Sequence, residues 1–236
     1  MKKVSFLNNL ILSLVITTML VACDKGLDFS KLDPFRFDEA NPTTVKAQVY
    51  NGSKYNSKIS TVRAVSDMSS TRSTQEMITL RAAPTGETVA TTDWSGGNFT
   101  LTLPTTIDES KLRDSKDIIP SLFGQGIEYY YVWFSVKSYY IRLAAYDAAG
   151  NYFDDLVLYD SKADDDVWVY FLYVERDLPV WELGENPTPI KVFKKGWNIV
   201  YLASISAEKN VTYKPTSDLY WMLYRDLPYE YFIARD

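Results

Sequence analysis

Short strand-like segments separated by turn residues follow one another from Thr43 almost to the end of the chain, and this pattern constrains the fold most. Between Phe99 and Leu103, apolar residues alternate with threonines, as in a strand that buries one face. Similar segments are predicted at 45–50, 59–65, 77–82, 88–92, 128–136, 139–146, 152–159, 167–174, 190–193, 197–204 and 219–223. The loops are too short for crossover helices, which favours antiparallel pairing. We therefore expect a mainly β fold, an antiparallel β-sandwich.

The strand pattern lapses between 107 and 126. Asp108 is placed to cap a short helical turn through Leu112, and Pro120 then interrupts the chain. This lapse predicts two sandwich-like domains, an N-terminal β domain at 43–106 and an aromatic-rich C-terminal β domain at 127–236, joined by a linker at 107–126. The alternative is an excursion within one larger sandwich.

The residues Leu20-Val21-Ala22-Cys23 resemble a bacterial lipobox, in which the cysteine is lipidated and becomes the first residue after cleavage. They close an apolar stretch that begins just after Lys2 and Lys3, so 1–22 is predicted to be a lipoprotein signal peptide. Cys23 is the only cysteine of the chain, which leaves no partner for a disulfide. We expect acyl chains on Cys23 to attach the mature protein to a lipid bilayer without spanning it.

The residues after Cys23 bear on where the anchored protein lies. Lys25, at the third mature position, resembles the surface-export pattern of Bacteroidota lipoproteins, whereas Gly26 and Leu27 stand where that pattern has acidic residues. We expect an outer-membrane location, on the cell surface or on the periplasmic face. Residues 23–42 show no sustained period and predict a tether.

Composition excludes several classes of function. The chain has no histidine, which removes Ser-His-Asp and Cys-His nucleophile systems and histidine-bearing zinc sites. A formal charge of −5 without a basic stripe argues against nucleic acid as a partner. We expect a protein that is not an enzyme, has no cofactor, and serves the envelope as a structural or binding component. The alternative is a carboxylate-dependent glycoside hydrolase or other envelope hydrolase, although nothing selects two of the 30 acidic residues.

An aromatic run at 129–134 is the candidate ligand site. On a strand, Tyr129, Tyr131 and Trp133 would share one face, and Tyr130, Val132 and Phe134 the other. One of the faces must be core. The face with Tyr129, Tyr131 and Trp133 is either a platform on which sugar rings stack or a surface covered by a second layer. A glycan or another envelope protein is therefore the expected partner. Residues 168–173 show the same two-sided apolar character, which favours burial on both faces.

Acidic residues cluster at 154–166. Asp164, Asp165 and Asp166, with Asp154-Asp155 and Asp160 nearby, offer oxygen ligands of the kind that calcium prefers. The spacing of an EF-hand is not present, so we interpret the cluster as a solvated turn and predict no metal site.

Two stretches resemble segments that recur in lipoproteins of Bacteroidota. They are Gly97 to Pro104, and Val169 to Val174 followed downstream by Lys194 to Tyr201. The resemblance implies a β-rich surface or periplasmic lipoprotein and brings no activity with it. Within the second stretch, Gly196 is predicted to take a positive φ at a hairpin entry, with Trp197 as the first inward residue of the next strand.

Overall fold

The computed structural model describes residues 27–66, 83–84, 86–123, 130–131, 135–162, 165–182, 189–203 and 218–228. The chain forms two compact units, Met1–Lys31 and Leu32–Asp236. In the described part of the first unit, the Asp28 carboxylate accepts a hydrogen bond from the backbone N–H of Ser30 at 3.0 Å. All helices and strands below belong to the second unit.

The unit Leu32–Asp236 is mainly β with antiparallel sheets, which confirms the predicted fold class. Its strands are β1 (Thr44–Gln48), β2 (Thr61–Ser66), β3 (Thr88–Asp93), β4 (Asn98–Thr102), β5 (Arg113–Asp114), β6 (Tyr130–Tyr131), β7 (Lys137–Tyr146), β8 (Tyr152–Asp160), β9 (Asp165–Val174), β10 (Leu178–Glu182), β11 (Pro189–Phe193), β12 (Gly196–Ala203) and β13 (Leu219–Leu223). Its helices are α3 (Ser115–Phe123) and the 3₁₀ helices η1 (Gly52–Tyr55), η2 (Glu109–Lys111) and η4 (Tyr224–Asp226). The strand predicted at 77–82 lies outside the described residues.

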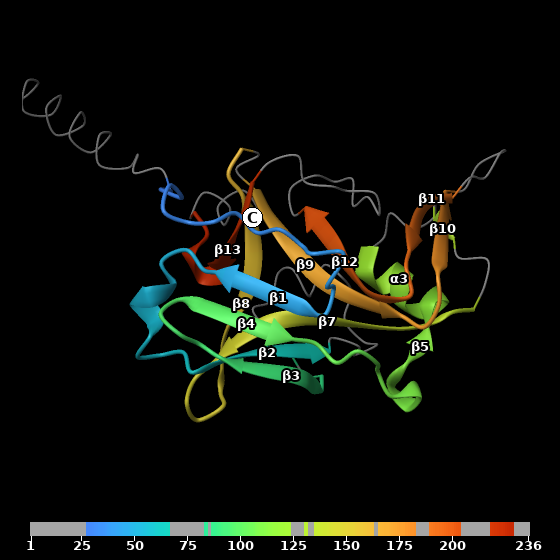
Figure 1. Cartoon of the computed structure of the whole chain (residues 1–236), viewed down its shortest axis with the longest axis horizontal. Coiled ribbons are helices and arrows are strands. Elements are labelled where there is room, and N and C mark those ends of the chain that lie inside the picture. The colour runs from blue at the N-terminus through green and yellow to red at the C-terminus, as the bar shows by residue number, and fades with distance from the viewer. Residues whose placement is uncertain are drawn as a thin grey trace, which may run out of the picture. The chain divides into compact units, whose positions relative to one another are not determined.

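Eight strands form the largest sheet (Figure 1). Its order is β12-β9-β8-β7-β2-β3, with β13 beside β8 and β5 beside β7. The first half of β7, at 138–141, pairs with β9, whereas 144–146 pair with β8. Strand β8 is therefore inserted between β7 and β9 over only part of their length, and the sheet branches there.

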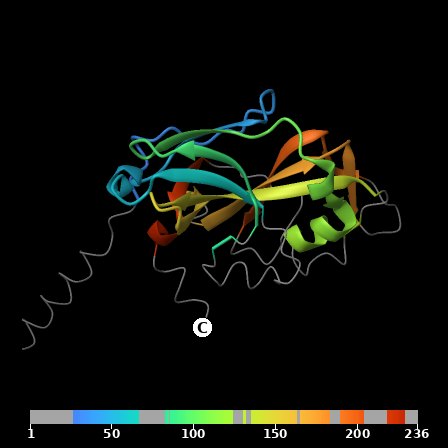
Figure 2. The same ribbon diagram turned by 90° about the horizontal axis from the view of Figure 1, so that it is seen from below.

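Strands β1 and β4 form a two-stranded sheet that packs on one face of the large sheet, whereas α3 lies toward the other face (Figure 2). The alternation predicted for β4 is confirmed, because Phe99 and Leu101 are buried and the residues between them are exposed. Both join a core that also contains Ile141, Phe171 and Trp221. The described strands contain no disulfide, and burial of this apolar surface is what holds the layers together.

The division into two sandwich-like domains, 43–106 and 127–236, is not confirmed. Strand β2 from the first range pairs with β7 from the second along its whole length. The intervening range 107–126 contains η2, β5 and α3, and β5 pairs with β7. Asp108 caps η2 as predicted, since its carboxylate accepts from the Ser110 backbone N–H at 2.9 Å.

The segment predicted as a tether, 23–42, is packed against the β body from residue 33 onward. Phe35 is buried, its backbone N–H donates to the Leu219 carbonyl at 2.8 Å, and its ring contacts that of Trp221 edge-on. Phe37 packs against Phe171, with 6.2 Å between the ring centroids. The chain therefore becomes part of the core well before β1.

The hairpin entry at Gly196 is confirmed. Gly196 has a φ of +97°, and Trp197 is buried with its indole N–H donating to the Pro104 carbonyl at 2.7 Å. No helix in the described part of the chain is long and apolar enough to cross a bilayer.

Candidate functional site

The outer face of the β1–β4 sheet is a ladder of polar side chains. Because Val45 and Leu101 face the core, their neighbours along each strand point outward. The register places Gln48 opposite Asn98, Lys46 opposite Thr100, and Thr44 opposite Thr102. Side chains directly opposite one another on a sheet lie about 5 Å apart, so each pair can contact one ligand together.

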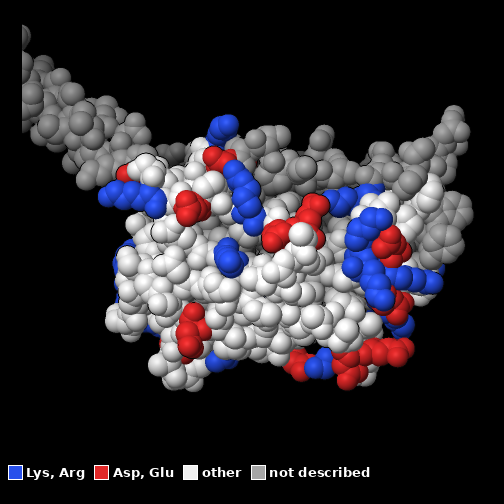
Figure 3. All heavy atoms as spheres, viewed as in Figure 1, with Lys and Arg blue, Asp and Glu red and all other residues white. Residues whose placement is uncertain are grey.

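A groove of about 780 Å³ runs over part of this ladder. One wall comes from the segment 33–36, and the other comes from the turn that joins β3 to β4. It is lined by Asp33, Pro34, Phe35, Arg36, Lys46, Ala47, Gln48, Asp93, Ser95, Asn98, Phe99, Thr100 and Trp221. Figure 3 shows few charged side chains over β1 and β4.

The wall at 93–98 is a tight hairpin turn. Ser95 and Asn98 exchange two backbone hydrogen bonds of 2.9 Å, and Gly96 and Gly97 both have positive φ. Two adjacent residues with positive φ are typical of a type I′ turn, which matches the twist of the flanking strands. The hydroxyl of Thr92 donates to the Thr100 carbonyl at 2.8 Å and ties β3 to β4 beside the turn.

The wall at 33–36 is held by contacts to both layers. The backbone N–H of Asp33 donates to the Gln48 side-chain oxygen at 3.2 Å, and Arg36 pairs with Asp218 across the surface. Below, the Trp221 ring meets Phe35 at 5.2 Å and Phe99 at 6.2 Å between centroids, both edge-on. This aromatic floor fixes the spacing between the wall and the ladder.

The groove offers hydrogen bonds of both kinds and carries no excess of positive charge. Gln48 and Asn98 present amides, and Ser95 and Thr100 present hydroxyls. The carboxylates of Asp33 and Asp93 face Lys46 and Arg36, and Arg36 is also paired with Asp218. The arrangement suits a neutral ligand with many hydroxyl groups.

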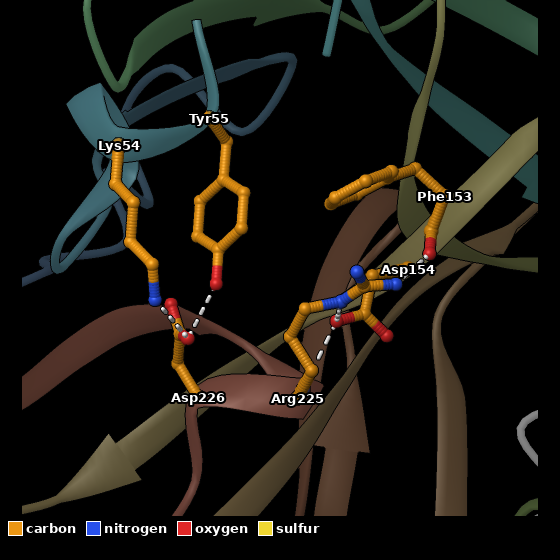
Figure 4. Close-up of polar contacts among 6 residues, drawn as sticks. All are labelled: Lys54, Tyr55, Phe153, Asp154, Arg225 and Asp226. Carbon is orange, nitrogen blue, oxygen red and sulfur yellow. Dashed lines mark hydrogen bonds and ion pairs between the residues drawn. The ribbon is translucent and has the colours of Figure 1, made fainter. Parts of the chain in front are cut away.

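A second polar cluster joins η1, the start of β8 and η4 (Figure 4). The hydroxyl of Tyr55 donates to an Asp226 carboxylate oxygen at 2.6 Å, and Lys54 Nζ lies 3.6 Å from the same oxygen. Burial and the bond to Asp226 raise the pKa of Tyr55, so its proton stays in this bond at neutral pH.

Arg225 completes this cluster. Its backbone N–H and its Nε each donate to Asp154 Oδ2 at 2.9 Å, and its guanidinium also donates to the Phe153 carbonyl and covers the Phe153 ring at 3.9 Å. Burial raises the pKa of Asp154 despite the bonds from Arg225. These contacts of Arg225 and Asp154 join β8 to η4, which indicates a structural clamp.

The acidic residues at 154–160 are not in a solvated turn, so that expectation was wrong for them. Asp154, Asp155 and Asp160 are each at most 3% exposed. Asp155 accepts from Arg142 at 2.7 Å at the point where the large sheet branches. Asp164 and the side chains of Asp165 and Asp166 lie outside the described residues. No group of three or more described acidic or cysteine side chains could hold a metal ion.

The site residues predicted from the sequence either do not line this groove or lie outside the residues that the structure describes. Cys23, Tyr129 and Trp133 fall outside the described residues, so the lipid site and the aromatic platform stay predictions. The backbone of Tyr131 lies in β6, opposite Trp181 of β10. The strand at 168–173 is buried on both faces, as predicted.

The groove was not predicted, because its parts are separated in sequence. The signal that could have pointed to it is the polar half of the alternation in β1 and β4, which reads as ordinary solvent-facing residues. Comparison of this chain with protein-family models, with curated proteins and with solved structures gave no match.

Proposed function

We propose that this protein is a lipid-anchored, non-catalytic binding component of a Gram-negative envelope, and that the groove over β1 and β4 takes a neutral glycan. The observation that carries the proposal is the polar ladder of Gln48, Asn98, Lys46 and Thr100 between two fixed walls. The groove volume of about 780 Å³ lies in the range of roughly 300–1,000 Å³ that is common for small-molecule sites.

A sugar fits the chemistry of this groove. Each hydroxyl of a sugar both donates and accepts a hydrogen bond. The Gln48 oxygen already accepts from the Asp33 backbone N–H, so Gln48 would donate to a sugar hydroxyl. The Asn98 NH₂ group donates to the Ser95 and Gly96 carbonyls at 3.4 Å, so Asn98 would accept from one. The edges of Phe35, Phe99 and Trp221 provide apolar contact for the C–H faces of the ring. Because Asp33 and Asp93 face Lys46 and an Arg36 that is already paired with Asp218, the groove has no excess of positive charge to select an anionic ligand.

The anchor is the second part of the proposal. The lipobox ending at Cys23 supports attachment to the outer membrane, at the surface or on the periplasmic face. An anchored protein remains near the membrane while its β body meets material outside it. The aromatic residues Tyr129, Tyr131 and Trp133 remain a proposed second contact for the same class of ligand.

A carboxylate-dependent hydrolase is the second candidate, because Asp33 and Asp93 line the same groove. In that case D33N or D93N would abolish release of reducing sugar from a glycan that the protein binds. Under the binding proposal no reducing sugar is released by the unmodified chain.

The test is a glycan array probed with the full chain in non-ionic detergent. Gln48→Ala with Asn98→Ala removes one rung of the ladder, and we expect roughly tenfold weaker binding to the glycans that the unmodified chain retains. Thr44→Ala with Thr102→Ala is the matched control, since this rung belongs to the same two strands but does not line the groove. Equal loss in both variants, or no glycan bound by the unmodified chain, would contradict the proposal.

A further inference from the structure

A smaller cavity is lined in part by the residues that follow the groove wall in sequence. It measures about 270 Å³ and is bounded by residues 37–42, by the end of β11 and by the turn into β12. The rings of Phe37, Phe193 and Trp197 line it. The Trp197 ring is fixed, because its N–H donates to the Pro104 carbonyl and its ring packs edge-to-face with that of Tyr173, with 5.5 Å between the centroids.

Three lysines line this cavity in a chain whose formal charge is −5. Lys194 is already neutralised, because its Nζ lies 2.9 Å from the Asp177 carboxylate. Lys191 and Lys195 have no carboxylate within 4.0 Å among the described residues. Among the described residues that line the cavity, Glu39 is the only acidic one, so an excess of positive charge remains there.

The turn that presents these lysines is held from two sides. The Asn198 side chain accepts from the Lys194 backbone N–H at 2.9 Å and donates to the Lys194 carbonyl at 2.7 Å. Asp177 accepts from the Lys195 backbone N–H at 2.9 Å. A fixed turn limits the conformational entropy that binding costs. Figure 3 shows Lys and Arg, with Asp and Glu among them, at the end of the molecule where β10 and β11 lie in Figure 1.

We propose that this cavity binds the anionic group of a small ring-bearing acid, a sugar that carries a carboxylate or a sulfate. Lys191 and Lys195 would donate to the anion, and the aromatic walls would contact the ring. A cavity of about 270 Å³ lies just below the usual range for drug-sized ligands, so a single ring is the size that fits. The proposal stands on its own residues and does not require the neutral-glycan groove.

The test is calorimetric titration of the full chain in non-ionic detergent with glucuronate, galactose 6-sulfate and, as the uncharged counterpart, glucose. We expect at least one of the two anions to bind, more weakly as salt is raised, and glucose not to bind this cavity. The order of affinity between the two anions identifies the anionic group. Lys191→Ala with Lys195→Ala should weaken anion binding about tenfold or more.

The matched control is Lys58→Ala with Lys116→Ala, which removes the same charge from two exposed lysines elsewhere. It should change the affinity less than about twofold, because distant exposed charges are screened. Lys191→Arg with Lys195→Arg should keep binding, which separates lost charge from lost folding. Gln48→Ala with Asn98→Ala should leave it unchanged. No binding of either anion, equal binding of glucose and glucuronate by the variant with Gln48→Ala and Asn98→Ala, or equal loss in the control would overturn the proposal.

Discussion

The ion pair between Arg142 and Asp155 shows how the fold handles charge at a single pair of residues. Both side chains are buried, with the guanidinium 2.7 Å from the carboxylate, at the branch of the large sheet. The nearby hydroxyl of Tyr152 stays protonated, because burial and then the charge of Asp155 raise its pKa. The pair thus places opposite charges where three strands meet.

Removing one partner leaves the other charge buried, so Arg142→Met should lower the free energy of unfolding by about 3–5 kcal/mol. Arg142→Met combined with Asp155→Leu should cost less than the single change, because no buried charge then remains. Urea denaturation of the three proteins measures this order. A double variant that loses more than the single one would contradict the assignment of a buried ion pair.

The raised pKa of Tyr55 predicts that the stability of the fold depends on pH. Its pKa is raised in the folded state by burial and by the bond to Asp226, so the unfolded chain ionises first as pH rises. The stability that Tyr55 contributes is therefore fully present below about pH 10 and declines above it. Tyr55→Phe should cost about 1–3 kcal/mol at pH 7, and the difference from the unmodified chain should shrink above pH 10. A difference that grows above pH 10 would show the opposite sign of the shift.

At the same scale, the burial of acidic residues is what the sequence predicts least well. Asp147 does lie in an exposed turn, where it accepts from the backbone of Ala149 and Asn151. Asp154 and Asp155 look the same in sequence, yet each is buried against an arginine that is distant along the chain or on another strand. Local composition carries no information about such partners.

At the scale of elements, two glycines with positive φ allow the cost of a left-handed backbone to be measured separately from the cost of a steric clash. Gly97 has φ +87°, and a Cβ there would lie 2.8 Å from the Ser53 nitrogen; Gly196 has φ +97° and open space around it. Gly196→Ala should cost about 1–2 kcal/mol from the left-handed conformation alone. Gly97→Ala should cost roughly 1–3 kcal/mol more, because the η1 backbone must move. Denaturant titration checks this, and equal costs would contradict the close approach at Gly97.

The strands were largely predictable, because each one either alternates apolar with polar residues or is apolar throughout, and each ends at turn residues. Strand β10 was missed, since Pro179 interrupts the apolar residues Leu178, Val180 and Trp181 and removes a backbone donor. The packing of Phe35 was missed because residues 23–42 show no periodic hydrophobic pattern, and a single buried aromatic residue does not create one. The groove depends on strand register and on the segment 33–36, neither of which a one-dimensional pattern contains.

At the scale of the whole molecule, we propose that acyl chains on Cys23 hold the β body at the membrane. Cys23→Ser should abolish acylation, so the protein should leave the membrane fraction or remain unprocessed. Mass spectrometry of the N-terminal peptide from the membrane fraction checks the modification. An unmodified mature form that begins elsewhere would contradict the anchor.

The most direct test of the central claim is where a glycan selected on the array binds. Nuclear magnetic resonance titration of the full chain in detergent follows the side-chain amides of Gln48 and Asn98, with that of Asn151, which is hydrogen-bonded to Asp147 within its turn, as an internal reference. We predict shifts for Gln48 and Asn98 and for the backbone at 33–36, and none for Asn151. Shifts that leave Gln48 and Asn98 unchanged while the glycan binds would place the site elsewhere and contradict the account.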